Sequence, residues 1–194
     1  MDLAGKKVAV LAAPGFEDSE LSEPVNALGY AGAEVVLVAL AEDDKQGIRG
    51  KRGTVVTADA TIDEVDAGDF DAVVIPGGKS PAHLRRDQRI LDLVNAVLES
   101  GKPVAAICHG PQVLAAAGAL KGRTATSYRS VRKEVEAAGA RFLDEPVVVD
   151  GNLITSRKPD DIPRFVNALI AALREQGNDG GTNEPVQGKI HQQG

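Results

Sequence analysis

Short apolar runs, each four to six residues long, recur along this chain and are separated by helical patterns. Runs of this length are typical of strands buried on both faces, because a half-exposed strand alternates apolar and polar residues. A sheet built from such strands is parallel and is covered by helices on both sides. The sequence therefore predicts an α/β fold with a mostly parallel sheet. The four runs are residues 8–12, 35–40, 72–75 and 103–107.

Amphipathic helices are expected between and after these runs. In residues 87–99, apolar side chains recur at helical spacing and share one face. Ser80 and Pro81 are typical of a helix start, with serine as the cap and proline in the first turn. Asp150-Gly151-Asn152 predicts a β-hairpin, and residues 54–57 predict a small strand pair. The other expected helices are residues 18–31, 111–117, 131–138 and 162–173.

Length and composition limit the classes of protein to consider. The chain has 194 residues, so we expect one domain over residues 1–176, and a disordered tail over residues 177–194, which lack a core pattern. A net charge of -6 argues against nucleic acid as a main partner, because phosphate binding needs a basic face. No apolar run reaches the roughly 18 residues that a membrane span needs. A lone cysteine and no recognisable signal peptide favour a cytoplasmic protein.

Three loops follow expected strands and should lie together. In a parallel sheet the carboxyl ends of the strands meet at one edge, where such folds place their binding sites. The loops are residues 14–20, 76–80 and 108–111. We therefore expect the functional residues at this edge.

Cys108 stands where a strand becomes a helix, with Gly110 two residues later. A lone cysteine after a strand is usually a small buried apolar residue. A sharp strand-to-helix turn, however, is the nucleophile elbow that exposes an attacking side chain. The helix start favours the thiolate, so we expect a Cys108 pKa of roughly 5–6. The backbone N–H groups of His109 and Gly110, with a donor from Gly77-Gly78, are candidates to bind an oxyanion.

Four carboxylates gather in the first turns of the helix expected at residues 18–31. Acidic side chains at this end complement the helix dipole, which is sufficient to explain most of them. One of them could instead turn inward, become protonated through burial and donate a hydrogen bond to the sulfur. The spacing does not single one out. They are Glu17, Asp18, Glu20 and Glu23.

The histidines allow two interpretations. His109 is a candidate general base for Cys108, or else a helix-start residue with a structural hydrogen bond. His83 is expected at the surface, and His191 lies in the expected tail. Without a cluster of histidine, cysteine and carboxylate at ligand spacing, we expect no catalytic metal.

The segment around Cys108 resembles a known signature. Ala106-Ile107-Cys108-His109-Gly110-Pro111 is similar to that of the ThiJ/PfpI superfamily, in its PfpI branch of intracellular-protease-like and general stress proteins. Four further segments agree in order and spacing, and the resemblance runs from about Lys6 to Leu173. They are residues 16–21, Ile75-Pro76-Gly77-Gly78, Thr126-Ser127-Tyr128, and residues 147–151 with Thr155-Ser156-Arg157.

The resemblance implies a flavodoxin-like α/β sandwich related to class I glutamine amidotransferase domains. It implies Cys108 as nucleophile, Glu20 as the carboxyl beside the sulfur, and oxyanion donors from the backbone of Gly78 and His109. It implies homodimers or larger homo-oligomers such as hexamers, and no metal or organic cofactor. The pocket residues that it implies are Glu17, Gly77 and Tyr128.

One residue departs from the peptidase-like members of this family. In those members, the loop after the Gly-Gly turn supplies a glutamate that orients the histidine across a subunit interface. Here Ala82 stands at that position, and alanine can neither carry charge nor accept a hydrogen bond. His109 therefore lacks that partner, whereas the Cys108–Glu20 pair is unaffected.

Three functions remain, in this order. The first is a deglycase- or glyoxalase-like hydrolase that uses Cys108 and Glu20 on small reactive carbonyls or glycated adducts. The second is a redox-sensing or chaperone-like stress protein without turnover, in which Cys108 is oxidised. The third is an intracellular cysteine peptidase, which Ala82 weakens.

Overall fold

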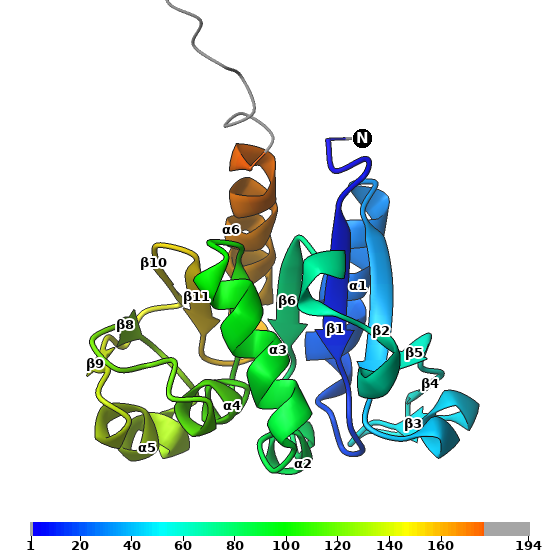
Figure 1. The fold of residues 1–194 in the computed structure, drawn as a ribbon. Coiled ribbons are helices and arrows are strands. Elements are labelled where there is room, and N and C mark those ends of the chain that lie inside the picture. The colour runs from blue at the N-terminus through cyan, green and yellow to red at the C-terminus, as the bar shows by residue number, and fades with distance from the viewer. Residues whose placement is uncertain (1, 177–194) are drawn as a thin grey trace, which may run out of the picture.

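A computed structural model describes residues 2–176, in which seven strands form one central sheet (Figure 1). The sheet order is β10-β11-β7-β6-β1-β2-β5, and every neighbouring pair is parallel except β10 with β11. The expected mostly parallel sheet is confirmed. Its strands are β1 (Lys7–Leu11), β2 (Glu34–Ala39), β5 (Ala60–Thr61), β6 (Ala72–Ile75), β7 (Val104–Ile107), β10 (Val147–Asp150) and β11 (Leu153–Ser156).

Helices cover both faces of the sheet. In Figure 1, α3 and α4 lie in front of the strands, whereas α1 lies behind them. The helices are α1 (Asp18–Tyr30), α2 (Ser80–Leu84), α3 (Gln88–Glu99), α4 (Pro111–Ala116), α5 (Arg132–Ala137) and α6 (Ile162–Glu175). Single 3-10 turns are η1 (Glu42–Gln46), η2 (Ile62–Glu64), η3 (Ala67–Asp69), η4 (Arg129–Val131) and η5 (Pro159–Asp161).

The sheet separates two apolar cores because successive strand residues point to opposite faces. On β1, Ala9 and Leu11 pack in the core beneath α3 and α4, and Val8 and Val10 pack in the core beneath α1 and α6. Cys108 belongs to the second core, on the side of α1. The thiol is thereby directed toward the helix that carries the four carboxylates.

The long elements agree with the expected ones to within about two residues, and the hairpin around Gly151 is confirmed. The expected strand pair near residue 55 is also present, with Val55–Val56 (β4) paired to Ile48–Arg49 (β3). Sequence patterns gave no sign of β5, nor of the pair β8 (Thr124–Ala125) and β9 (Arg141–Phe142). Two-residue strands are too short to show a periodicity.

The expected cap role of Ser80 is wrong. Lys79 occupies the N-cap position of α2, and no side chain caps this helix. The Ser80 hydroxyl instead accepts a hydrogen bond of 3.0 Å from the backbone N–H of Ala13. This bond joins the end of β1 to the start of α2, so Ser80 connects two elements rather than ending one.

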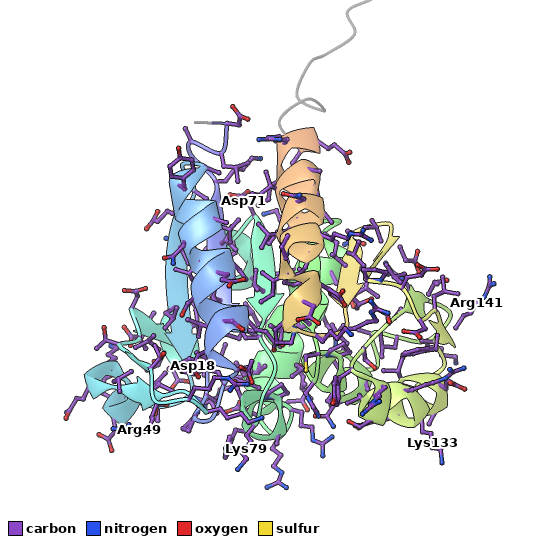
Figure 2. The ribbon with its side chains drawn as sticks, turned by 180° about the vertical axis from the view of Figure 1, so that it is seen from behind. Asp18, Arg49, Asp71, Lys79, Lys133 and Arg141 are labelled. Carbon is purple, nitrogen blue, oxygen red and sulfur yellow. The ribbon has the colours of Figure 1, made fainter. Side chains whose placement is uncertain are left out.

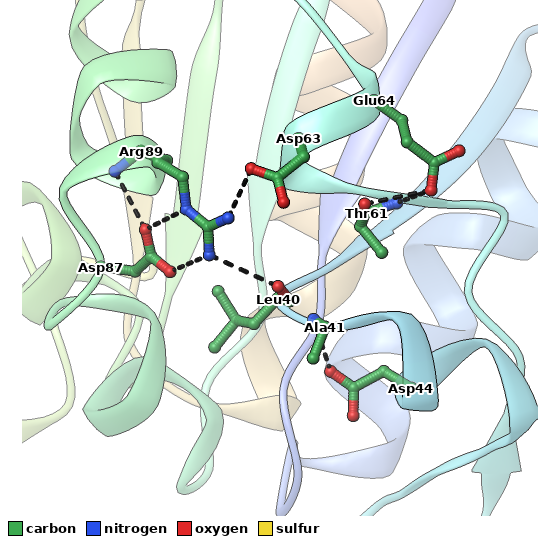
Figure 3. Close-up of polar contacts among 8 residues, drawn as sticks. All are labelled: Leu40, Ala41, Asp44, Thr61, Asp63, Glu64, Asp87 and Arg89. Atoms are coloured by element: carbon green, nitrogen blue, oxygen red, sulfur yellow. Dashed lines mark hydrogen bonds and ion pairs between the residues drawn. The ribbon is translucent and has the colours of Figure 1, made fainter.

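An arginine-centred network fixes the start of α3 (Figure 3). The Arg89 guanidinium donates to Asp87 on its own turn, to Asp63 on η2, and to the carbonyl oxygen of Leu40 after β2. Arg89 and Asp63 are exposed and Asp87 is half-buried at the surface, so each bond adds little to stability. The network ties α3 to the end of β2 and takes no part in the candidate site.

The expected tail over residues 177–194 lies outside the described residues. Within residues 2–176, no helix is both long and apolar enough to cross a membrane.

Candidate active site

The three loops expected at one sheet edge do meet there. The backbone N–H of Glu17 donates to the carbonyl oxygen of Gly77 at 3.1 Å, and Phe16 forms a β-bridge with Gly78. Figure 2 shows Asp18 and Lys79 at this edge, where the strands end, and Asp71 toward the opposite edge. Cys108 follows the neighbouring strand β7 directly. The prediction that these loops share an edge is confirmed.

Cys108 has a left-handed backbone with a φ of 63°, the sole positive φ outside glycine in residues 2–176. A side chain in this conformation costs about 1–2 kcal/mol. Two hydrogen bonds hold it: the N–H of Cys108 donates to Ser156 O at 3.0 Å, and the N–H of Tyr128 donates to Cys108 O at 2.9 Å. The strained turn presents the thiol to the loops of β1 and β6, as the nucleophile-elbow interpretation requires.

Two glycines permit the close packing around the thiol. A Cβ atom on Gly110 would clash with the carbonyl oxygen of Ile75. A Cβ on Gly77 would lie 2.5 Å from Oε1 of Glu20 and 2.9 Å from the Cβ of Cys108. The Glu20 carboxyl and the Cys108 turn therefore occupy the space that a side chain at position 77 would need.

Glu20 is the carboxylate that turns inward. Its side chain is fully buried, and its Oε1 accepts a hydrogen bond of 2.9 Å from the N–H of Gly77. Its Oε2 has no hydrogen-bond partner within residues 2–176. Burial raises the pKa of Glu20 to about 8, so the carboxyl is mostly protonated at neutral pH. The carboxyl lies beside Cys108, so it is placed to exchange a proton with the thiol.

The other three acidic side chains do not contact the thiol. Glu17 accepts a bond of 2.7 Å from Nε of Arg52 at the mouth of the site. Asp18 accepts 3.0 Å bonds from the backbone N–H groups of Arg52 and Thr54, and so holds that loop against α1. Glu23 is exposed. Of the four candidates, Glu20 alone lies beside the thiol. It is the residue that the family resemblance implies.

The expected depressed pKa of the thiol is wrong in direction. Burial, followed by the charge of Glu20, raises the pKa of Cys108 to about 12, although hydrogen bonds from the His109 and Gly78 backbones oppose the shift. The Cys108 residue is only 8% exposed. The Gly110 N–H, expected to face the site, instead donates to Ile107 O at 2.8 Å. Helix-start N–H groups therefore favour the thiolate less than the sequence suggested.

His109 turns back toward its neighbour. Its Nδ1 lies 3.3 Å from Sγ of Cys108, and its ring stacks on Tyr128 with centroids 5.3 Å apart. Burial, aided by the charge of Lys51, lowers the pKa of His109, so the imidazole is neutral at neutral pH. A neutral Nδ1 at this distance can accept the thiol proton. Ala82 is half-buried on α2, and His83 is exposed there.

A model of the "DJ-1/PfpI family" matches residues 6–172 of the chain. The chain belongs to the DJ-1/PfpI family. The resemblance of the segment around Cys108 is thereby confirmed, and so is the flavodoxin-like fold. A two-domain protein from Anabaena variabilis, with dj-1/thij/pfpi-like and ferritin-like domains, superposes with a TM-score of 0.84 at 43% identity. The match covers 94% of this chain and 52% of that protein.

Three curated relatives in the DJ-1/PfpI family match over nearly their full length. General stress protein 18 of Bacillus subtilis is 49% identical, covering 88% of this chain and 99% of the relative. The putative cysteine protease YraA of the same organism is 50% identical, covering 87% and 99%. Protein/nucleic acid deglycase 2 of Escherichia coli is 46% identical, covering 87% and 98%.

The DJ-1/PfpI site of this chain opens into a cavity of about 380 Å³. Six of the site residues that the family resemblance implies line it: Glu17, Glu20, Gly78, Cys108, His109 and Tyr128. Gly77, implied as a pocket residue, does not line it, and its N–H is bonded to Glu20 instead. Lys51, Arg52, Lys79 and Pro159 also line it and were not predicted, since no sequence pattern fixes the paths of their loops. In the part of the chain that the structure describes, no group of three or more metal-binding side chains lies together.

Proposed function

We propose that this protein is a stress-related hydrolase that acts on small reactive carbonyls, or on their adducts with amines and thiols. The observation that carries the proposal is the buried carboxyl of Glu20 beside the Cys108 thiol, with Nδ1 of His109 at 3.3 Å. This gives one nucleophile, one acid and one base. Relatives named as a general stress protein and as a deglycase support the same assignment.

In the first step, Sγ of Cys108 attacks the aldehyde carbon of a dicarbonyl such as methylglyoxal. The S–C bond forms, the C=O π electrons move to oxygen, and the thiol proton passes to Nδ1 of His109. Because the proton leaves as the S–C bond forms, the attack needs no accumulated thiolate despite the raised pKa of the thiol. The backbone N–H groups of Gly78 and His109 stabilise the oxyanion, which takes the Glu20 proton.

In the second step, the Glu20 carboxylate removes the proton from the former aldehyde carbon and returns it to the neighbouring carbon. His109 gives a proton to the former ketone oxygen and takes one from the former aldehyde oxygen. The product is a lactoyl thioester on Cys108. The former aldehyde carbon is oxidised and the former ketone carbon is reduced, so no external oxidant is needed. Water then hydrolyses the thioester and releases lactate. An adduct first breaks its bond to the amine or thiol, which takes the proton of the adduct's hydroxyl group, and the aldehyde so released enters the same sequence.

Peptide hydrolysis places different demands on this site. An amide nitrogen leaves only when a well-oriented imidazolium protonates it. Within residues 2–176, the one hydrogen-bonding contact of the His109 side chain is the sulfur of its neighbour, and Ala82 offers no acceptor. One relative is named a putative cysteine protease, but we rank peptidase activity below carbonyl chemistry for this chain.

The test is lactate release from methylglyoxal and from its cysteine adduct, with casein cleavage measured in parallel. We expect the wild type to release lactate, Cys108→Ser to abolish the release, and casein to remain intact. Casein cleavage that depends on Cys108, without lactate release, would favour the peptidase. Peroxide oxidation of Cys108 with no turnover of any substrate would favour the redox-sensing alternative.

A further inference from the structure

A second cavity, of about 390 Å³, lies beside the first. Tyr128 lines both cavities, and the consecutive residues Lys158 and Pro159 line one each. The two spaces therefore share a wall, and the ring of Tyr128 that stacks on His109 forms part of it. The second cavity is lined by Ser127, Tyr128, Arg129, Asp144, Arg157 and Lys158.

Arg157 is held rigidly at this second cavity. Its Nε and Nη2 donate to the two oxygens of Asp161 at 2.9 and 3.2 Å, and its Nη1 donates to Asp144 at 3.0 Å. A guanidinium has five N–H donors, so two remain to bind another acceptor. The two carboxylates offset its charge. Arg157 thus supplies oriented donors, while net positive charge must come from its neighbours.

Arg129 and Lys158 supply that charge. Both are exposed, and within residues 2–176 Arg129 forms no ion pair. The ammonium of Lys158 lies 3.9 Å from the exposed carboxylate of Asp160, at the limit of an ion pair. Lys51 and Lys79 line the Cys108 cavity and add further positive charge, with Lys51 3.9 Å from the Glu17 carboxylate. A chain with a net charge of -6 therefore has a basic rim around its nucleophile.

We propose that the second cavity is an anion subsite, in which Arg129, Lys158 and the free N–H groups of Arg157 bind a phosphate or carboxylate on the substrate. The inference rests on the proposed function, because it places the anion beyond Tyr128 while the carbonyl-derived end of the same molecule reaches Cys108. Planar guanidinium donors and a mobile ammonium suit such oxygens. The net negative charge of the chain disfavours long nucleic acids, whereas one anionic group needs only this local rim.

Binding is tested without any turnover, by titrating ¹⁵N-labelled Cys108→Ser protein with inorganic phosphate. We expect saturable shifts of the amide signals of residues 127–129 and 157–158. Arg129→Gln and Lys158→Gln should each weaken binding by roughly fivefold, in keeping with exposed ion pairs. Lys133→Gln removes the same charge from exposed α5 and is the matched control. Shifts that do not saturate, or equal weakening by all three variants, would overturn the subsite.

Turnover provides the second arm, with two hemithioacetals of methylglyoxal that differ only in charge. One carries N-acetylcysteine, a carboxylate, and the other carries the neutral N-acetylcysteine amide. We expect the carboxylate adduct to have the lower KM, Arg129→Gln to remove the difference in KM, and Lys133→Gln to retain it. Equal KM values would overturn the anion subsite and leave the proposed function intact. Specific phosphate binding without turnover of either adduct would support the anion subsite and overturn the proposed function.

Discussion

At the scale of single residues, the site depends on one carboxyl that the fold keeps protonated. Glu20 is fully buried, and one of its oxygens is bound by the Gly77 N–H. Its pKa of about 8 lies above the ordinary value of 4.5. The native state thus retains a proton that the unfolded chain releases between these two pH values.

This difference predicts how stability depends on pH. Between about pH 5 and pH 8, the wild-type free energy of unfolding should fall by roughly 1.4 kcal/mol per pH unit relative to Glu20→Gln, whose amide has no proton to lose. Below about pH 4.5 both states of the wild type hold the proton, so the dependence disappears. Urea unfolding at several pH values measures the effect. Parallel curves for the two proteins would show that Glu20 is ionised in the native state.

Single residues also show where sequence reasoning succeeds and fails. Cys108 could be singled out because a buried strand leads directly into a glycine-containing helix start. Glu20 could not be separated from its three neighbours by spacing alone, since only packing determines which carboxylate turns inward. The direction of the Cys108 pKa shift was missed for the same reason. Burial outweighs the helix-start amides, and the sequence does not report the depth of a thiol.

At the scale of elements, long segments were predictable and short ones were not. The core strands are continuous apolar runs and α3 has a clear helical period, and the structure reproduces both. The loop that carries Lys51 and Arg52 is held by Asp18 through hydrogen bonds to backbone groups. No local pattern encodes such a long-range contact, so the basic rim of the site was not anticipated.

The bond between Ser80 and Ala13 predicts a measurable role in joining elements. Ser80→Ala would leave the buried N–H of Ala13 without its acceptor, which typically costs about 1–3 kcal/mol. A cap role would cost helix stability alone, whereas this bond also fixes the loop after β1. We expect denaturant unfolding to show the loss, and Ser80→Thr to retain much of the stability. An unchanged stability of Ser80→Ala would contradict this account.

At the scale of the whole molecule, we expect assembly into at least a dimer, as the family resemblance implies. Large apolar side chains are exposed at Tyr30, Val55 and Val149, at 90%, 54% and 57%. They belong to three different elements, α1, β4 and β10, and single exposed apolar side chains are also normal on monomers, so the expectation rests on the family resemblance. Light scattering at micromolar concentration should give at least twice the 20.2 kDa mass of the chain. A monomer mass would contradict the expectation.

The central claim is that Glu20 moves protons for a reaction at Cys108. Its most direct test is the kcat for lactate release from methylglyoxal by the wild type, Glu20→Gln and Glu23→Gln. Glu23 is an exposed acid on the same helix and serves as the matched control. We expect Glu20→Gln to lower kcat by roughly 10²–10⁴-fold, the usual contribution of acid–base catalysis, and Glu23→Gln to match the wild type. A Glu20→Gln enzyme with wild-type kcat would contradict the claim.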